Sequence, residues 1–246
     1  MKIVNRHRRS APPSRAADAH KWEFKSRFRR HAFGWKSQPA IIRVKQAVAE
    51  IKKVAKKDPV LAAEGSIAFL ERVSPALEHV DSSSGALGTA VTNAIAELVP
   101  IIASAPADAK TRDAWLERLW EAYQEDDIPC IEWLGDHWGQ LCGSREIASA
   151  WADRFLGTVR MAWSPDPNLR GCFKGTTNCL SALIAAERYD DVLTLLELEP
   201  YKMWHDRQYG VKALSAQGKN AKANRYAEEG RGLNDSRIAI ARASAS

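Results

Sequence analysis

Apolar residues recur along the chain at the spacing of helix faces, in one segment after another. The clearest stripe is Ile41, Val44, Val48, Ile51 and Ala55, with intervals of three and four residues. This spacing puts all five side chains on one face of a helix, and lysines cover much of the remaining surface. The sequence shows no sustained alternation of β-branched and polar residues and no Asn-Gly or Asp-Gly hairpin turn. The pattern therefore predicts an all-α fold.

Five further helices are predicted before residue 164. Their apolar stripes are Ala63, Ile67, Leu70 and Leu77; Leu87, Val91, Ile95, Leu98 and Ile102; Trp115, Leu119 and Tyr123; Ile131, Leu134, Trp138 and Leu141; and Ile147, Trp151, Phe155 and Val159. Asp58 and Ser144 stand where N-caps are needed, Asp108 or Thr111 can cap the helix between them, and Pro59 suits the first helical position. Pro75 lies inside a predicted helix and is expected to kink it.

Two prolines interrupt the helical pattern in the segment from Ser164 to Asn168. Such a segment cannot continue a helix, so it is the best sequence candidate for an internal boundary. We expect a basic and partly disordered N-terminal arm over 1–37, a helical array over 38–164, and TPR-like helical repeats over 165–246. Truncation of the last part is a hypothesis.

Internal similarity follows that loop. The segment ALIAAERYDDVL over 182–193 aligns with ALSAQGKNAKAN over 213–224, at an offset of 31 residues. Small residues such as Ala185 and Ala216 allow paired helices to approach closely, and stacked pairs bury faces that one pair cannot bury alone. The pattern resembles tetratricopeptide repeats, although the usual spacing is about 34 residues and the Trp-x-x-Leu-Gly opening is missing. We expect an α-solenoid of antiparallel helix pairs.

Four segments, FRRHAFGWKSQPA, KDPVLAAEG, SPALEHVDSSSGALGTAV and SPDPNLRG, resemble a group of uncharacterised bacterial helical-repeat proteins. The resemblance runs from about residue 25 to about residue 230. It implies stacked helices and no particular activity. Members of that group continue further, and a helix expected to begin at Asp235-Ser236 has barely two turns before Ser246. A C-terminally truncated member is therefore our hypothesis.

Charge is distributed unevenly. Residues 1–57 contain 17 Lys and Arg against 3 Asp and Glu, whereas the whole chain has a net charge of +6. The candidate residues for binding nucleic acid or another anionic partner are Lys25, Arg27, Arg29, Arg30, Trp35 and Lys36. Basic side chains neutralise phosphates and aromatic rings stack on bases. The alternative is that the arm packs, through aromatic residues such as Phe24, Phe28 and Trp35, on the acidic body of its own chain or of a second copy. The first 17 residues also have the Arg-rich composition of a transit peptide.

Catalytic patterns are missing from the sequence. Cys130, His137 and Cys142 do not have zinc-ligand spacing, and no nucleophile elbow or phosphate-binding loop occurs. Asp126 with Asp127, and Glu132 with Asp136, are paired carboxylates of a kind that acid–base catalysis uses, but such pairs are usually solvated surface. We predict no catalytic residues, no metal and no cofactor, and interpret the thiols as reduced.

The sequence thus favours a cytoplasmic, non-enzymatic scaffold that binds a protein or peptide partner. No uninterrupted apolar run approaches the roughly 20 residues of a membrane span. Six tryptophans lie between Trp115 and Trp163, and we expect them in the core, with a peptide-binding groove as the alternative. A nucleic-acid-associated protein using the N-terminal arm is the second functional hypothesis.

Overall fold

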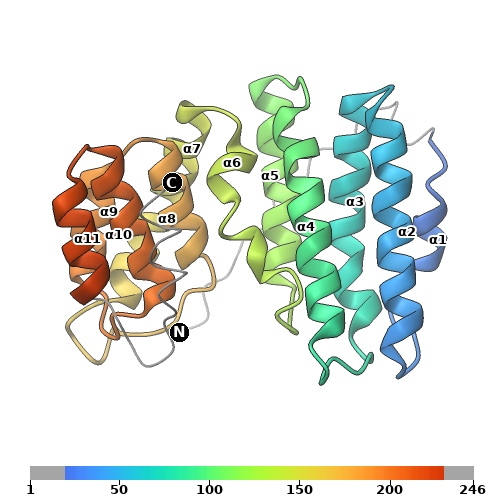
Figure 1. The fold of residues 1–246 in the computed structure, drawn as a ribbon, viewed down its shortest axis with the longest axis horizontal. Helices are drawn as coiled ribbons and strands as arrows, with labels where there is room; N and C mark the ends of the chain where they lie inside the picture. The colour runs from blue at the N-terminus through green and yellow to red at the C-terminus, as the bar shows by residue number, and fades with distance from the viewer. Residues whose placement is uncertain (1–19, 230–246) are drawn as a thin grey trace. The chain divides into compact units, whose positions relative to one another are not determined.

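The computed structural model describes residues 20–229 and contains helices but no strand in that range (Figure 1). The helices are α1 (Glu23–Arg27), α2 (Ser37–Ala55), α3 (Pro59–Leu77), α4 (Ala86–Ser104), α5 (Ala109–Gln124), the 3-10 turn η1 (Glu132–Leu134), α6 (Trp138–Cys142), α7 (Arg145–Ala162), α8 (Thr176–Ala185), α9 (Tyr189–Glu197), α10 (Trp204–Ala216) and α11 (Asn220–Glu229). The all-α prediction is confirmed. The transit-like segment and the helix expected at Asp235 lie outside the described residues.

The chain divides into two compact units, residues 1–133 and residues 134–246. The division does not fall at the proline-rich loop from Ser164 to Asn168, which lies inside the second unit. The reason is that α7 and α8, the helices on either side of that loop, pack against each other. A loop that cannot be helical therefore need not separate two cores.

In the first unit, α2 packs beside α4 and α3 packs beside α5, while α3 also contacts α2 and α4 (Figure 1). The predicted stripes form this core. Ile41, Val44, Val48 and Ile51 of α2 are buried, and so are all the predicted stripe residues of α3, α4 and α5. The hydrophobic periodicity thus predicted both the helices and the faces that they bury.

Helix starts in both units follow the predicted capping chemistry. The Asp58 carboxylate accepts a hydrogen bond from the Leu61 N–H at 2.9 Å, and Asp108 accepts one from Thr111 at 2.7 Å. Ser144 caps α7 through a 3.3 Å bond from Ile147. These bonds satisfy backbone N–H groups that have no partner inside their own helix.

The helix α4 is strongly apolar. Its length and its mean hydropathy of 1.6 would allow it to cross a membrane, and it is the one such helix among residues 20–229. Its predicted stripe is nevertheless buried in the core of the first unit. A core helix passes the same test of length and composition, so this helix is weak support for a membrane span.

The predicted helix through Ile131, Leu134, Trp138 and Leu141 is not formed as one element. Instead, a loop leads into η1 and then into α6. The buried carboxylate of Asp126 accepts hydrogen bonds from the Cys130 and Ile131 N–H groups, at 2.9 and 2.8 Å, and from the Ser74 hydroxyl. Because a side chain satisfies these N–H groups, the four apolar residues become buried without a continuous helix.

In the second unit, α8 contacts α6, α7, α9 and α10, and α10 contacts α9 and α11. The turns α8–α9 and α10–α11 have the same backbone hydrogen bonds at an offset of 31 residues. Arg188 donates to Leu183 and Lys219 donates to Leu214, both at 2.9 Å. Each turn also contains a residue with positive φ, Glu187 at 56° and Gly218 at 73°. The sequence similarity therefore coincides with two helix–turn–helix segments of matching geometry.

Most of the tryptophans expected in the core are there. Trp115, Trp138 and Trp151 are almost completely buried, whereas Trp133 is 47% exposed. The spacing of seven residues between Cys172 and Cys179 is also that of one helix face, but α8 begins at Thr176 and Cys172 lies in the exposed loop before it. Both thiols are free.

Candidate functional site

The described part of the N-terminal arm, from His20 onwards, docks on the first unit through its aromatic side chains. Trp22, Phe24 and Phe28 are 3%, 1% and 2% exposed. The rings of Phe24 and Phe28 contact Phe69 of α3 edge-on, with centroids 5.8 and 5.1 Å apart. Gly65 makes room for Trp22, since a Cβ there would lie 2.3 Å from the indole. These three aromatic residues therefore belong to the core and are not free to stack on a ligand.

Backbone hydrogen bonds and ion pairs reinforce this docking. The Glu50 carboxylate of α2 accepts bonds from the N–H groups of Glu23 and Phe24, at 2.7 and 3.2 Å, at the start of α1. Arg30 lies 3.7 Å from Glu78 at the end of α3. Of the two alternatives for the arm, packing on its own chain thus describes residues 20–36.

The six predicted site residues are only partly brought together. Lys25, Arg29 and Arg30 line one cleft of about 520 Å³, together with Arg72 and Arg118. The same cleft is lined by Glu71, Glu121 and Glu125, so three acids partly offset its five basic residues. Burial and the neighbouring carboxylates of Glu117, Glu125 and Glu71 raise the pKa of Glu121 above its usual range.

The other three predicted residues lie outside the lining of that cleft. Arg27 pairs with Glu23 at 3.1 Å and donates to Gln46. Trp35 is 71% exposed, and Lys36 is the residue before α2. Trp35 is therefore the aromatic residue of the predicted set that a ligand could reach.

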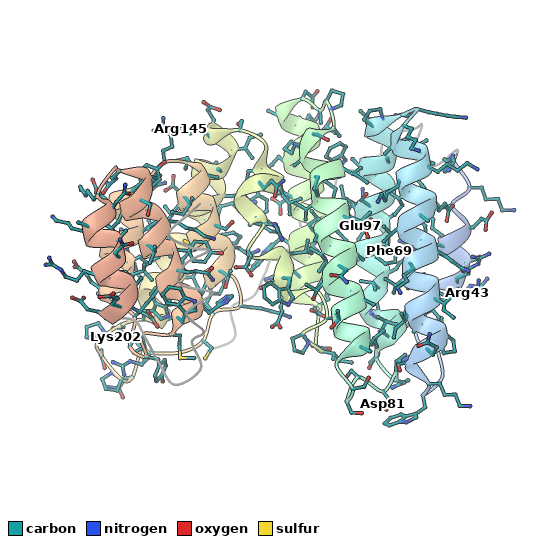
Figure 2. The ribbon with its side chains drawn as sticks, in the orientation of Figure 1. Arg43, Phe69, Asp81, Glu97, Arg145 and Lys202 are labelled. Carbon is teal, nitrogen blue, oxygen red and sulfur yellow. The ribbon has the colours of Figure 1, made fainter. Side chains whose placement is uncertain are left out.

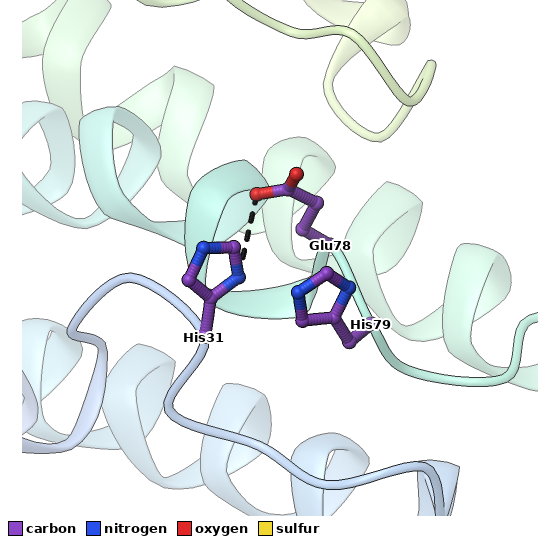
Figure 3. A group of neighbouring side chains, drawn as sticks. All are labelled: His31, Glu78 and His79. Atoms are coloured by element: carbon purple, nitrogen blue, oxygen red, sulfur yellow. Dashed lines mark ion pairs between the residues drawn. The ribbon is translucent and has the colours of Figure 1, made fainter.

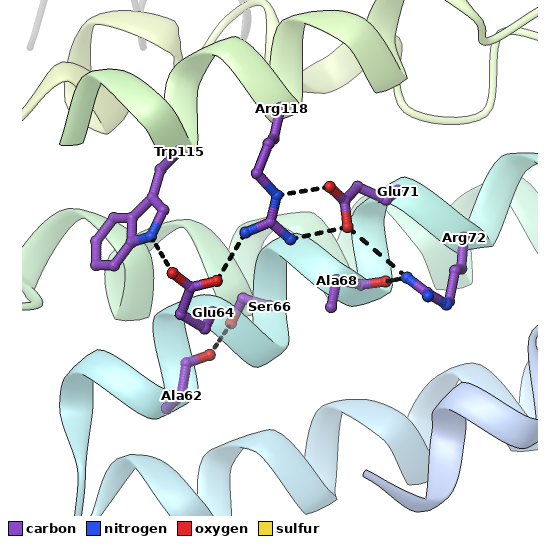
Figure 4. Close-up of polar contacts among 8 residues, drawn as sticks. All are labelled: Ala62, Glu64, Ser66, Ala68, Glu71, Arg72, Trp115 and Arg118. Carbon is purple, nitrogen blue, oxygen red and sulfur yellow. Dashed lines mark hydrogen bonds and ion pairs between the residues drawn. The ribbon is translucent and has the colours of Figure 1, made fainter. Parts of the chain in front are cut away.

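A network of charged side chains lies at the wall of the cleft, between α3 and α5 (Figure 4). Arg118 donates two hydrogen bonds to Glu71, from Nε to Oε1 at 2.7 Å and from Nη2 to Oε2 at 2.9 Å. It donates a third, at 2.7 Å, to Glu64. The indole of Trp115 donates to the other oxygen of Glu64, also at 2.7 Å. These hydrogen bonds and ion pairs raise the pKa of Arg118 despite the opposing effect of burial. Each charge has a partner, so the network fixes α5 on α3.

A second hollow lies between α2 and α4 and has a different character. This groove, as we call the space lined by Val44, Lys45, Val48, Ala49, Lys52, Lys53, Lys56, Ala90, Asn93, Ala94 and Glu97, has a volume of about 490 Å³. Its walls are the exposed edges of the two helices whose stripes form the core (Figure 2, in which Glu97 is labelled on α4). From the sequence, these lysines could be predicted only to cover the solvent-exposed surface of their helix, because nothing in the sequence places α4 beside α2.

The charge of the groove is strongly one-sided. Four lysines of α2 line it, against a single acid, Glu97, which pairs with Lys52 at 2.6 Å. Lys45, Lys53 and Lys56 form no ion pair with an acidic residue in the described range, 20–229. The groove thus combines an apolar floor with unneutralised positive charge along one edge.

Of the residues weighed for catalysis or metal binding, Asp126 has a structural role and Cys130 lies in a largely buried environment. Asp126 is 3% exposed and organises the loop before η1. Burial raises the pKa of the Cys130 thiol to about 12, with a further contribution from Asp126, and burial raises that of Cys179 to about 12. These thiols are protonated at neutral pH and do not present the free thiolate of an activated nucleophile.

Fold and surface together define an all-α helical protein with a basic groove. No family profile, curated protein or solved structure matches the chain.

Proposed function

We propose that this chain is a non-enzymatic helical-repeat scaffold, TPR-like in its second unit, that binds an acidic peptide helix in the groove between α2 and α4. The observation that carries the proposal is the groove itself, with its volume of about 490 Å³, its apolar floor and its lysine edge. The matching turns of α8–α9 and α10–α11 support the repeat part of the proposal.

The lining of the groove favours an amphipathic helix as the bound element. Val44, Val48, Ala90 and Ala94 form the apolar floor and are only 1–8% exposed, so a partner helix would lay its apolar face over this floor and over the exposed Ala49 at its edge. The lysine edge runs from Lys45 to Lys56, which corresponds to about 16 Å of helix or roughly three turns of a partner. A peptide of about 12 residues is therefore long enough to span it.

The positive charge of the groove determines which charge its partner should have. Lys45, Lys53 and Lys56 carry positive charge that residues 20–229 do not pair, so Asp or Glu on the polar face of a bound helix would supply the missing partners. Complementary charge increases the association rate and discriminates against basic peptides more than it adds to affinity. We therefore expect acidic amphipathic helices to bind and basic ones of equal hydrophobicity to be rejected.

A displayed library of 12- to 20-residue amphipathic helices, with acidic or basic polar faces, tests the proposal on the full chain. Enriched peptides are labelled and their binding is measured by fluorescence anisotropy. Ala49→Trp fills the groove from an exposed position, and K53E/K56E reverses its charge; each is expected to weaken binding at least tenfold. The control K110E/K222E makes the same change of charge at exposed lysines outside the groove and should leave binding unchanged.

Two outcomes contradict the proposal. One is the absence of any enriched acidic helix; the other is enriched peptides whose binding A49W does not affect. Circular dichroism of each variant verifies that the helices are intact.

Nucleic-acid association remains the second candidate, and one observation favours it: Lys25, Arg29 and Arg30 line the same cleft, near the segment that holds the exposed Trp35. Deleting the arm would remove core aromatic residues, so the suitable variants are R29E/R30E and W35A. Anisotropy of labelled single- and double-stranded oligonucleotides, with binding that weakens steeply with salt and is lost in R29E/R30E, would establish this function. Salt-insensitive binding, or none, would reject it.

A further inference from the structure

Two histidines and a glutamate converge on the surface of the first unit, away from the groove. His31 lies in the segment between α1 and α2, and Glu78 and His79 follow α3 (Figure 3). One ligand atom from each side chain lies within 4.8 Å of the other two. Nδ1 of His31 is 3.4 Å from Oε2 of Glu78, and the two imidazole rings are stacked, with centroids 4.3 Å apart and planes 9° apart.

The backbone holds His31 in this position at a cost. Its φ of 55° lies in the left-handed region, which residues other than glycine seldom adopt. Its N–H donates to the carbonyl of Pro75 at 3.1 Å, one of the carbonyls in the last turn of α3. Backbone strain of this kind persists where surrounding bonds enforce it, and it gathers at binding sites.

The arrangement meets the requirements of a transition-metal ion. Zinc bonds to histidine nitrogen and carboxylate oxygen at about 2.0–2.2 Å, so two ligand atoms of a tetrahedral site lie roughly 3.3–3.5 Å apart. The 3.4 Å between His31 and Glu78 already has this value. His79 is exposed and free of core packing, and its ligand atom already lies within 4.8 Å of the other two, so the proposed site requires only its side chain to move closer.

The donor set identifies the class of ion. Two imidazoles and one carboxylate suit zinc, nickel and copper, whereas magnesium and calcium take oxygen ligands. The set has three protein ligands, which leaves a position for water. All three side chains are partly or largely exposed, so an ion can enter from solvent.

We propose that His31, Glu78 and His79 bind a divalent transition-metal ion, with Zn²⁺ as the probe. The bound ion would join the segment before α2 to the end of α3. Arg30 limits the affinity, because its guanidinium lies 3.7 Å from the same Glu78 oxygen and competes with the ion for that carboxylate.

Isothermal titration of the full chain with ZnCl₂ at pH 7.5 in a non-chelating buffer tests the site. The background carries Cys172→Ser, because the exposed Cys172 thiol could bind zinc by itself. We expect one ion per chain, binding at least tenfold weaker in H31A, in H79A and in E78Q, and no heat with MgCl₂. Arg30→Gln removes the competing cation and should tighten zinc binding several-fold, a result that a damaged fold does not produce.

His205→Ala is the matched control, because His205 is also an exposed histidine with a polar neighbour, Thr177 at 3.0 Å, in the second unit. Its loss should leave the titration unchanged. Zinc binding that is absent, or that persists in the double variant H31A/H79A, overturns the proposal. In that case His31 and Glu78 form an ordinary surface ion pair.

Discussion

Replacing Arg118 by methionine is the sharpest test of how the first unit is held together. The side chain of Arg118 is 15% exposed and neutralises Glu64, which is 6% exposed, and Glu71, which is 27% exposed. Methionine keeps the apolar stem and removes the charge. Glu64 then stays buried with one hydrogen bond, from Trp115, and no opposite charge.

The magnitude follows from the unequal burial of the two carboxylates. Breaking a buried ion pair by removing one partner costs about 3–5 kcal/mol, because the remaining charge is uncompensated. Glu71 is exposed enough for water to solvate its carboxylate once Arg118 is removed. Most of the decrease in the free energy of unfolding therefore comes from Glu64. We therefore expect Arg118→Met to lower the free energy of unfolding by about 3 kcal/mol, the lower end of that range.

A double variant separates the buried charge from lost packing. Glutamine at position 64 keeps an oxygen for the Trp115 indole and removes the charge, so E64Q/R118M should be more stable than R118M by about 1–2 kcal/mol. Urea unfolding at pH 7, followed by tryptophan fluorescence and circular dichroism, measures both. Lys52→Met is the control in the same unit: its ion pair with Glu97 is about half exposed and should contribute less than about 1 kcal/mol.

Two results would refute this reasoning. If R118M loses no more than K52M, the network is not effectively buried. If E64Q/R118M is no more stable than R118M, the loss comes from packing and not from the charge on Glu64.

Two further predictions concern the arm and the second unit. Gly65→Ala puts a Cβ within 2.3 Å of the Trp22 ring, so we expect the arm to undock, with about 1–3 kcal/mol of destabilisation and faster hydrogen exchange in residues 22–28; unchanged exchange there would contradict it. Glu199 is buried, which raises the pKa of its carboxyl to about 7. Because the folded-state pKa exceeds the unfolded one, its contribution to stability is present at low pH and is lost as the pH rises through about 7. Urea unfolding between about pH 5 and 8 should therefore show a decline relative to Glu199→Gln, and parallel pH profiles would rule it out.

The helices with long apolar stripes could be predicted from sequence because burial and helical geometry agree along four or five turns. Asp58, Asp108 and Ser144 could be predicted for the same local reason, since an N-cap acts within three residues. The segment from Ile131 to Leu141 could not. Its apolar residues have helical spacing, but Asp126 supplies acceptors that replace the first helical hydrogen bonds. Hydrophobic periodicity indicates which residues are buried, but it does not indicate which acceptor each backbone N–H group uses.

The candidate sites depend on contacts between distant segments. The basic residues of the arm could be picked out as a charge run, yet the acids that hold the arm come from elsewhere: Glu50 of α2 binds its backbone, and Glu78, beyond α3, pairs with Arg30. His31 and His79 are 48 residues apart, and neither stands in a metal-binding motif. The groove exists only because α2 and α4 lie side by side. The apolar stripes show which face of each helix is buried, but they do not show which helices are neighbours.

The two proposals meet at the beginning of α2. The segment that leads into this helix is joined to the residues after α3 by two backbone hydrogen bonds, His31 to Pro75 at 3.1 Å and Asp81 to Trp35 at 2.9 Å. A metal ion on His31, Glu78 and His79 would add a third connection at the same place. Since α2 forms one wall of the groove, any ligand that fixes its start also reduces the freedom of that wall. If that freedom limits binding, zinc should tighten the binding of an acidic peptide, and equal affinity with and without zinc would show that the two sites act independently.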